Sequence, residues 1–141
     1  MGVQGVESDS ETPRSLGGGR LLAAISTRIV AILREHYGRG PTRAKTYVLD
    51  DLIVVVMRGS GFTPLEQTMM DDGGAERVVA LRHGFQVLIG DRYKLAIEEL
   101  TDRKVIAFLS QAHIEPDLTI EIFFMDGPLQ GFGAVEVVEP D

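Results

Sequence analysis

The sequence contains no cysteine, so it can form no disulfide bond, no thiolate metal site and no cysteine nucleophile. Long apolar runs are also missing. The longest, Leu52 to Met57, is far shorter than the roughly 20 residues of a membrane-spanning helix. The first residues lack the basic start and the apolar stretch of a signal peptide. These absences predict a soluble, cytoplasmic protein that does not insert directly into a membrane.

Positive charge is scarce. Lys and Arg number 14 against 21 Asp and Glu, which gives a formal net charge of −7. This balance argues against general nucleic-acid binding, because affinity for the phosphate backbone depends on basic side chains. Acidic residues gather near both ends, and the segment between them is nearly neutral. No nucleic-acid partner is therefore expected.

The chain of 141 residues has the length of one domain. Residues 1–19 are rich in Gly, Ser and Glu and cannot bury enough surface to offset their ordering entropy, so they are interpreted as a flexible acidic leader. Residues 20–126 are expected to form a single domain. Residues 127–141 form an acidic, Gly-rich extension with a candidate strand at 134–138.

Three segments have features typical of helices. Apolar residues recur at helical spacing over 21–37, and Gly38 stands where a helix commonly ends. Thr63 has the features of an N-cap, with Pro64 at the first helical position and Glu66 in the first turn of a short helix to about residue 70. The third helix is predicted over 75–100, and its apolar positions at helical spacing are Val78, Leu81, Phe85, Leu88, Ile89, Ala96 and Leu100.

Two hairpins complete the predicted fold. Residues 44–58 contain two strands around the turn residues Asp50 and Asp51, and residues 104–112 and 118–125 form the second pair. The order αββααββ predicts an α+β fold with two layers, in which helices pack on one face of an antiparallel sheet. Both hairpins are rich in apolar residues, so the second face of the sheet is expected to be buried by a second copy in a homodimer.

The segment from Gly38 to Lys45 is the most pointed local feature. It concentrates basic groups, flexible glycine backbone and a hydroxyl, which together suit an anion or a polar partner contact. The alternative is a capped helix end that turns into a strand, and a helix C-terminus repels anions. The spacing does not match a Walker loop. The candidate binding residues are Arg39, Gly40, Thr42, Arg43 and Lys45.

Catalytic and metal-binding patterns are weak. His113, Glu115 and Asp117 alternate near Glu121, but no second histidine stands nearby and Glu-Pro-Asp is ordinary turn chemistry. The adjacent acidic pairs cannot act as catalytic dyads on a helix, because neighbouring residues there point apart. No nucleophile elbow or HExxH helix is present. We therefore expect no catalytic residue, no metal and no cofactor, and hence a protein that is not an enzyme.

Several segments resemble one bacterial family. They are residues 21–26, GRGPTRAKTYVLDDLIVVVMRG at 38–59, FTPLE at 62–66, Gln86, and AIEELTDRKVIAFLSQAHIEPDLTIEIFFMD at 96–126. In this order they resemble the MpsC family of sodium-translocating, membrane-potential-generating systems, formerly a domain of unknown function, over about residues 20–126. The resemblance implies a small soluble accessory protein, coupled to membrane ion or inorganic-carbon transport and held at the inner membrane face by a partner. It carries over no catalytic residue.

Two other functions stay open. A small-anion or nucleotide sensor would use the loop from Gly38 to Lys45. An RNA-binding module is the least favoured, because the chain is acidic and lacks a GxxG loop between two helices.

Overall fold

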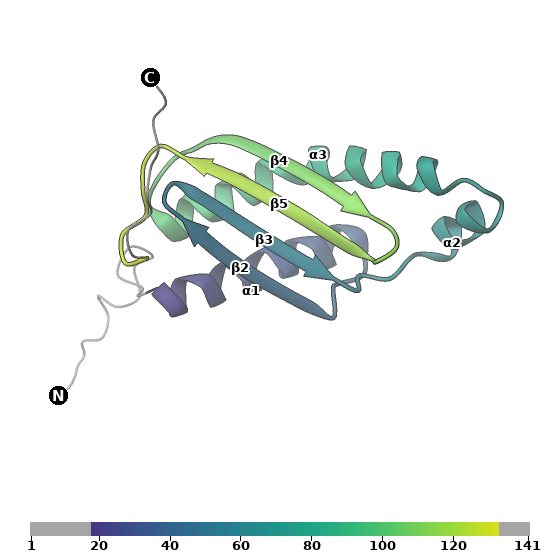
Figure 1. The fold of residues 1–141 in the computed structure, drawn as a ribbon, viewed down its shortest axis with the longest axis horizontal. Coiled ribbons are helices and arrows are strands. Elements are labelled where there is room, and N and C mark those ends of the chain that lie inside the picture. The colour runs from purple at the N-terminus through teal and green to yellow at the C-terminus, as the bar shows by residue number, and fades with distance from the viewer. Residues whose placement is uncertain (1–17, 133–141) are drawn as a thin grey trace, which may run out of the picture.

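The computed structural model describes residues 18–132 (Figure 1). Its elements follow the order αββααββ, which confirms the predicted fold class. They are α1 (Gly18–Tyr37), β2 (Arg43–Leu49), β3 (Leu52–Arg58), α2 (Pro64–Asp71), α3 (Ala75–Thr101), β4 (Val105–His113) and β5 (Leu118–Met125). Helix α1 begins at Gly18, inside the range expected for the leader, and the candidate strand at 134–138 lies outside the described residues.

The four strands form one antiparallel sheet in the order β2-β3-β5-β4. The two predicted hairpins are β2-β3 and β4-β5, and pairing of β3 with β5 joins them into a continuous sheet. The hairpin strands β3 and β5 are therefore central, and β2 and β4 lie at the edges. A register shift between Val105 and Ala107 leaves Ile106 as an extra residue near the start of β4.

Helices α1 and α3 cover one face of this sheet, and Figure 1 looks onto the opposite face with both helices behind it. The core lies between the layers. Fully buried residues from every part of it include Ile25 and Ile29 of α1, Ile53 of β3, Tyr93 of α3 and Phe123 of β5. The approach of α3 to the sheet explains a glycine in mid-helix, because a Cβ at Gly90 would lie 2.9 Å from the Phe108 ring.

The short helix α2 projects past the end of the sheet (Figure 1). Its predicted start is confirmed. The Thr63 side chain accepts a hydrogen bond from the Glu66 backbone N–H, and the Glu66 carboxylate accepts one from the Thr63 N–H, which makes a complete capping box. Pro64 occupies the first turn, where its missing N–H costs nothing.

Two of the apolar α3 positions noted at helical spacing, Leu81 and Leu88, do not lie on its buried side. These side chains are 50% and 81% exposed, whereas Arg82 and Gln86 are buried. The helix carries apolar residues on several sides, and its neighbours cover only one of them. Which side is buried was therefore decided by where α1 and the sheet lie.

Candidate functional site

The open face of the sheet, meaning the face away from the helices, is formed by alternate residues of each strand. On β5 the residues that point toward the helices are Thr119, Glu121, Phe123 and Met125, all buried. Their neighbours Leu118, Ile120, Ile122 and Phe124 point to the open face. The strand thus turns its entirely apolar side outward and buries a threonine and a glutamate, the reverse of a sheet with one solvated face.

Strand register divides the open face into four rows across the sheet. Row A is Leu49, Leu52, Phe124 and Ala107; row B is Tyr47, Val54, Ile122 and Leu109; row C is Lys45, Val56, Ile120 and Gln111; row D is Arg43, Arg58, Leu118 and His113. Rows A and B are apolar throughout, except for the Tyr47 hydroxyl. The edge positions are the most exposed, with Leu49 at 56% and Leu109 at 55%. No described element covers this surface.

Basic residues gather at the row D end. Arg43 and Arg58 are directly paired across β2 and β3, and Lys45 lies one row away with its Nζ 5.8 Å from the centre of the Tyr47 ring. None of these three forms an ion pair with another described residue. We call Arg43, Lys45 and Arg58 the basic strip.

The predicted loop residues do not all converge. Arg43 and Lys45 belong to the basic strip, but Arg39 donates to the Phe62 carbonyl oxygen at 3.1 Å, away from it. The Thr42 hydroxyl donates to the Arg58 carbonyl oxygen at 3.1 Å and so helps to start the β2-β3 ladder. Gly40 lies against the Arg34 side chain, where a Cβ would be 2.6 Å from its Nε.

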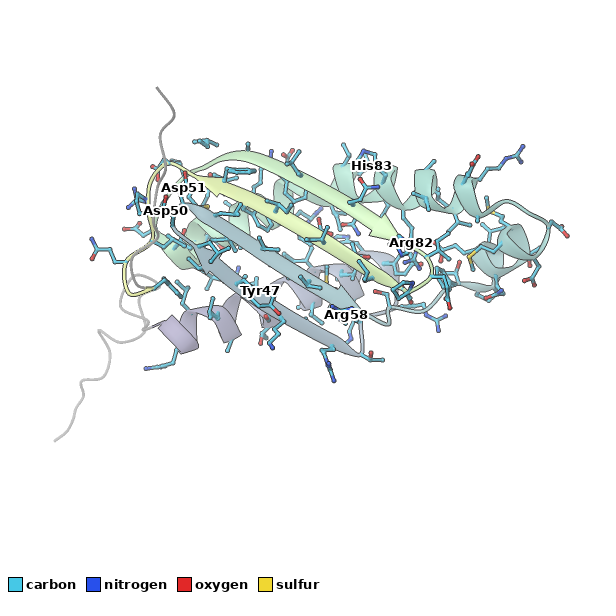
Figure 2. All side chains as sticks on the ribbon, viewed as in Figure 1. Tyr47, Asp50, Asp51, Arg58, Arg82 and His83 are labelled. Carbon is cyan, nitrogen blue, oxygen red and sulfur yellow. The ribbon has the colours of Figure 1, made fainter. Side chains whose placement is uncertain are left out.

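A buried polar cluster lies at the same end of the molecule, between the layers. Arg82 of α3, which is 5% exposed, donates to both carboxylate oxygens of Glu66 at 3.1 Å. It also donates to the Tyr37 hydroxyl at 2.7 Å and to the Gly61 carbonyl oxygen. Asp117 lies 3.7 Å from the guanidinium. The Phe62 and Tyr37 rings lie on the guanidinium, with centroids 4.5 and 5.3 Å away (Figure 2 labels Arg82).

Charge in this cluster is neutralised internally. Burial acts to raise the pKa of Glu66, but hydrogen bonds from Arg82 and Tyr37 hold it below its usual range. Burial and the Glu66 hydrogen bond raise the pKa of Tyr37 to about 12. The cavity beside Arg82 and Tyr37 measures about 10 Å³, room for one water at most. The cluster therefore ties α1, α2, α3 and the β4-β5 turn together and leaves no space for a ligand.

Comparison with known proteins adds the family. A family model described as Na+-translocating membrane potential-generating system (MpsC) matches residues 18–127. The chain belongs to the MpsC family. No curated protein and no solved structure matches it. The matched range coincides closely with the described helices and strands, so the family corresponds to the two-layer domain of this MpsC chain.

Glu121 of the MpsC chain is fully buried, and neither carboxylate oxygen has a hydrogen-bond partner among the described residues. Ser110 stands directly opposite on β4, and the buried Tyr93 hydroxyl of α3 also has no partner there. Burial raises the pKa of Glu121 to about 8, and the nearby Ser110 hydroxyl offsets only part of this. The carboxyl is therefore largely protonated at neutral pH.

The residues weighed above as metal ligands do not come together in the fold. His113 lies on the open face, with its Nδ1 2.8 Å from the Pro116 carbonyl oxygen. Asp117 accepts from the Gly61 N–H, and Glu121 points toward α3. Within residues 18–132 no three His, Cys, Asp or Glu side chains form a metal-binding group. No helix in that range is both long and apolar enough to cross a membrane.

Two features of this end of the molecule escaped the sequence interpretation. Arg58 joins the basic strip through its pairing with Arg43, a contact that follows from the hairpin register. The Arg82 cluster joins residues from four separate elements. The only available signal was an arginine placed among apolar helix positions, and that signal does not identify partners.

Proposed function

We propose that this MpsC chain is a non-enzymatic accessory protein that binds protein partners and works beside a Na+-translocating membrane system. The observation that supports this is the open face, whose apolar rows are uncovered in the single chain. Exposed apolar surfaces of this kind are typical of protein contacts. The family description supplies the setting.

The proposal has two parts. The open face binds a second copy of the chain, giving the homodimer expected from the apolar strands. Basic residues then provide the polar contact with a membrane subunit of an ion or inorganic-carbon transport system. Arg39, Arg43 and Lys45 are the candidates for that contact, and the protein would lie in the cytoplasm at the inner membrane face. The exposure of the basic strip at the sheet end supports this assignment.

Affinity purification from detergent-solubilised membranes tests the membrane contact. The wild-type chain is expected to retain an integral membrane transport subunit. A variant with Arg43→Glu and Lys45→Glu is expected to lose that subunit, whereas a matched variant with Arg77→Glu and Arg92→Glu on α3 keeps it. Retention of soluble proteins only, or equal retention by both variants, would contradict the proposal.

Measuring the Na+-dependent membrane potential tests whether the membrane contact serves sodium transport. Membrane vesicles prepared with the wild-type chain are expected to generate a larger Na+-dependent potential, reported by a voltage-sensitive dye, than vesicles without it. The basic-strip variant should resemble the vesicles that lack the chain. If the potential is the same in all preparations, the chain does not contribute to Na+-dependent potential generation, and this part of the proposal is wrong.

An anion sensor remains the second candidate, because Arg43 and Arg58 are neighbouring cations without an ion pair among the described residues. Thermal unfolding with bicarbonate, phosphate and nucleotides tests it. A ligand at 100 times its dissociation constant would stabilise the fold by about 2.7 kcal/mol. If none of these ligands raises the unfolding temperature, the anion-sensor function is wrong and protein binding is the one proposed function that stands.

A further inference from the structure

The open face changes in polarity along its strands. Row A and row B are apolar, row C keeps apolar residues only on the two central strands, and row D carries Arg43, Arg58 and His113. Beyond row A the β2-β3 turn places Asp50 and Asp51 at the opposite end of the sheet. Figure 2 shows these aspartates at one end, Arg58 at the other and Tyr47 between them.

Two copies can pack face to face in only two aligned ways around a two-fold axis that lies in the interface. An axis parallel to the strands sets each row against the same row of the other copy. An axis that crosses the strands reverses their direction. The two arrangements differ in which charges meet, because the face has one basic and one acidic end.

The parallel arrangement gathers like charges. It sets each β2-β3 hairpin over the β4-β5 hairpin of the other copy, so the two Arg58 side chains lie near each other at one end of the axis and the two Asp51 side chains at the other. Like charges at one interface are strongly unfavourable. The reversed arrangement does the opposite when its axis lies over row B. Row B then meets itself, row A meets row C, and the Asp50–Asp51 turn lies opposite row D with Arg58.

The edge strand β4 agrees with the reversed arrangement. Lys104 precedes β4 at the acidic end of the sheet, and Glu115 follows it at the basic end. Reversal about row B sets β4 over its own copy, so the end of β4 that follows Lys104 lies over the end that carries His113 and precedes Glu115.

We propose that the open face binds a second copy of this chain with its strands reversed, around a two-fold axis over the row Tyr47, Val54, Ile122 and Leu109. The inference rests on the self-association in the proposed function and specifies its geometry. Rows A and B and the central positions of row C are buried in the interface, and Asp51 pairs with Arg58 of the other copy. Arg43 and Lys45 of edge strand β2 lie at the rim, where a further partner can reach them.

Site-directed cross-linking tests this geometry cleanly, because the chain has no native cysteine. Packed sheets lie about 10 Å apart, so a bis-maleimide of about that span reports facing residues. Val54→Cys is expected to cross-link to itself. Leu52→Cys and Val56→Cys should not self-link efficiently, since reversal separates each from its copy by about 14 Å along the strand. Mixing the two variants should give the mixed cross-linked dimer.

Other cross-linking patterns would contradict either the reversed geometry or self-association itself. Efficient self-linking of Leu52→Cys and of Val56→Cys would establish the parallel arrangement, so self-association would stand and the reversed geometry would fall. A Val54→Cys chain that does not link, and is monomeric by light scattering, would overturn self-association itself. The membrane contact would remain testable by the purification described above.

Charge exchange provides an independent measurement. Asp51→Lys is expected to weaken dimerisation about tenfold, and Arg58→Asp similarly, with both variants folded by circular dichroism. An equimolar mixture should recover a heterodimer through one restored pair. If each variant dimerises as tightly as the wild type, or if the mixture recovers nothing, Asp51 and Arg58 do not face each other.

Discussion

The two faces of the sheet are made by the same strands, and both carry apolar residues. The face under α1 and α3 buries Thr46, Thr119 and Glu121 together with the apolar core. The open face shows unbroken apolar rows in the single chain. A strand such as β5 therefore exposes its more apolar side and buries its more polar one. The comparison teaches that the two apolar faces differ in cover: α1 and α3 close one, and no described element of the chain covers the other.

Neighbouring residues on β5 give the largest expected difference. Phe123→Ala should lower the free energy of unfolding by about 4 kcal/mol, because the ring is fully buried against Phe108 and leaves a cavity. Ile122→Ala should cost about 1 kcal/mol in the monomer, where the side chain borders solvent. Urea unfolding at low protein concentration measures both values.

The same two substitutions distinguish the two faces further when stability is measured at increasing protein concentration. If a second copy covers the open face, the cost of Ile122→Ala grows with concentration, because dimerisation stabilises the wild type more than the variant. The cost of Phe123→Ala should not change in this way. Equal and concentration-independent costs at both positions would mean that the two faces are not distinct.

Two arginines provide the next contrast. Arg82→Ala should destabilise the fold by about 3 kcal/mol, because it leaves the Glu66 carboxylate buried without its cation. At low protein concentration, where the chain is monomeric, Arg58→Ala on the open face should change stability by less than about 0.5 kcal/mol, since no buried partner within the chain depends on that charge. Thermal and urea unfolding compare them. A small effect of Arg82→Ala would show that the cluster does not hold α2 and α3 in place.

A further expected effect is a pH dependence from Glu121. Burial raises its folded-state pKa from 4.5 to about 8, so the folded state holds a proton that the unfolded state releases. The free energy of unfolding should therefore be highest near pH 4.5 with respect to this group and fall as pH rises toward 8, by at most about 1.4 kcal/mol per pH unit. Above that range the contribution should level off.

Glu121→Gln should remove this slope, and Glu115→Gln, an exposed turn substitution, should retain it. Subtracting each variant's stability profile from that of the wild type isolates the buried carboxyl from other titrating groups. A wild-type profile between pH 5 and 8 that matches the Glu121→Gln profile would mean that Glu121 ionises in place at little cost.

Much of the fold was predictable from local chemistry. The hairpin turn at Asp50 and Asp51 was recognisable because aspartate tolerates turn geometry, and Asp50 does adopt a positive φ of 58°. Thr63, Pro64 and Glu66 specified a helix start within four residues, which explains why the capping box was found correctly. The candidate binding residues were less predictable. Arg43 and Lys45 share a surface with Arg58, but Arg39 turns toward Phe62.

The sequence by itself determined the element order, the turn and cap positions and the absence of thiol chemistry, because each depends on residues close together in the chain. Only the tertiary structure decided which side of β5 and α3 is buried, and it placed Glu121 inside and Leu88 outside. It also assembled the Arg82 cluster from four elements and aligned the four rows of the open face. These choices depend on which element packs on which, and burial follows the available cover rather than the hydropathy of each strand face.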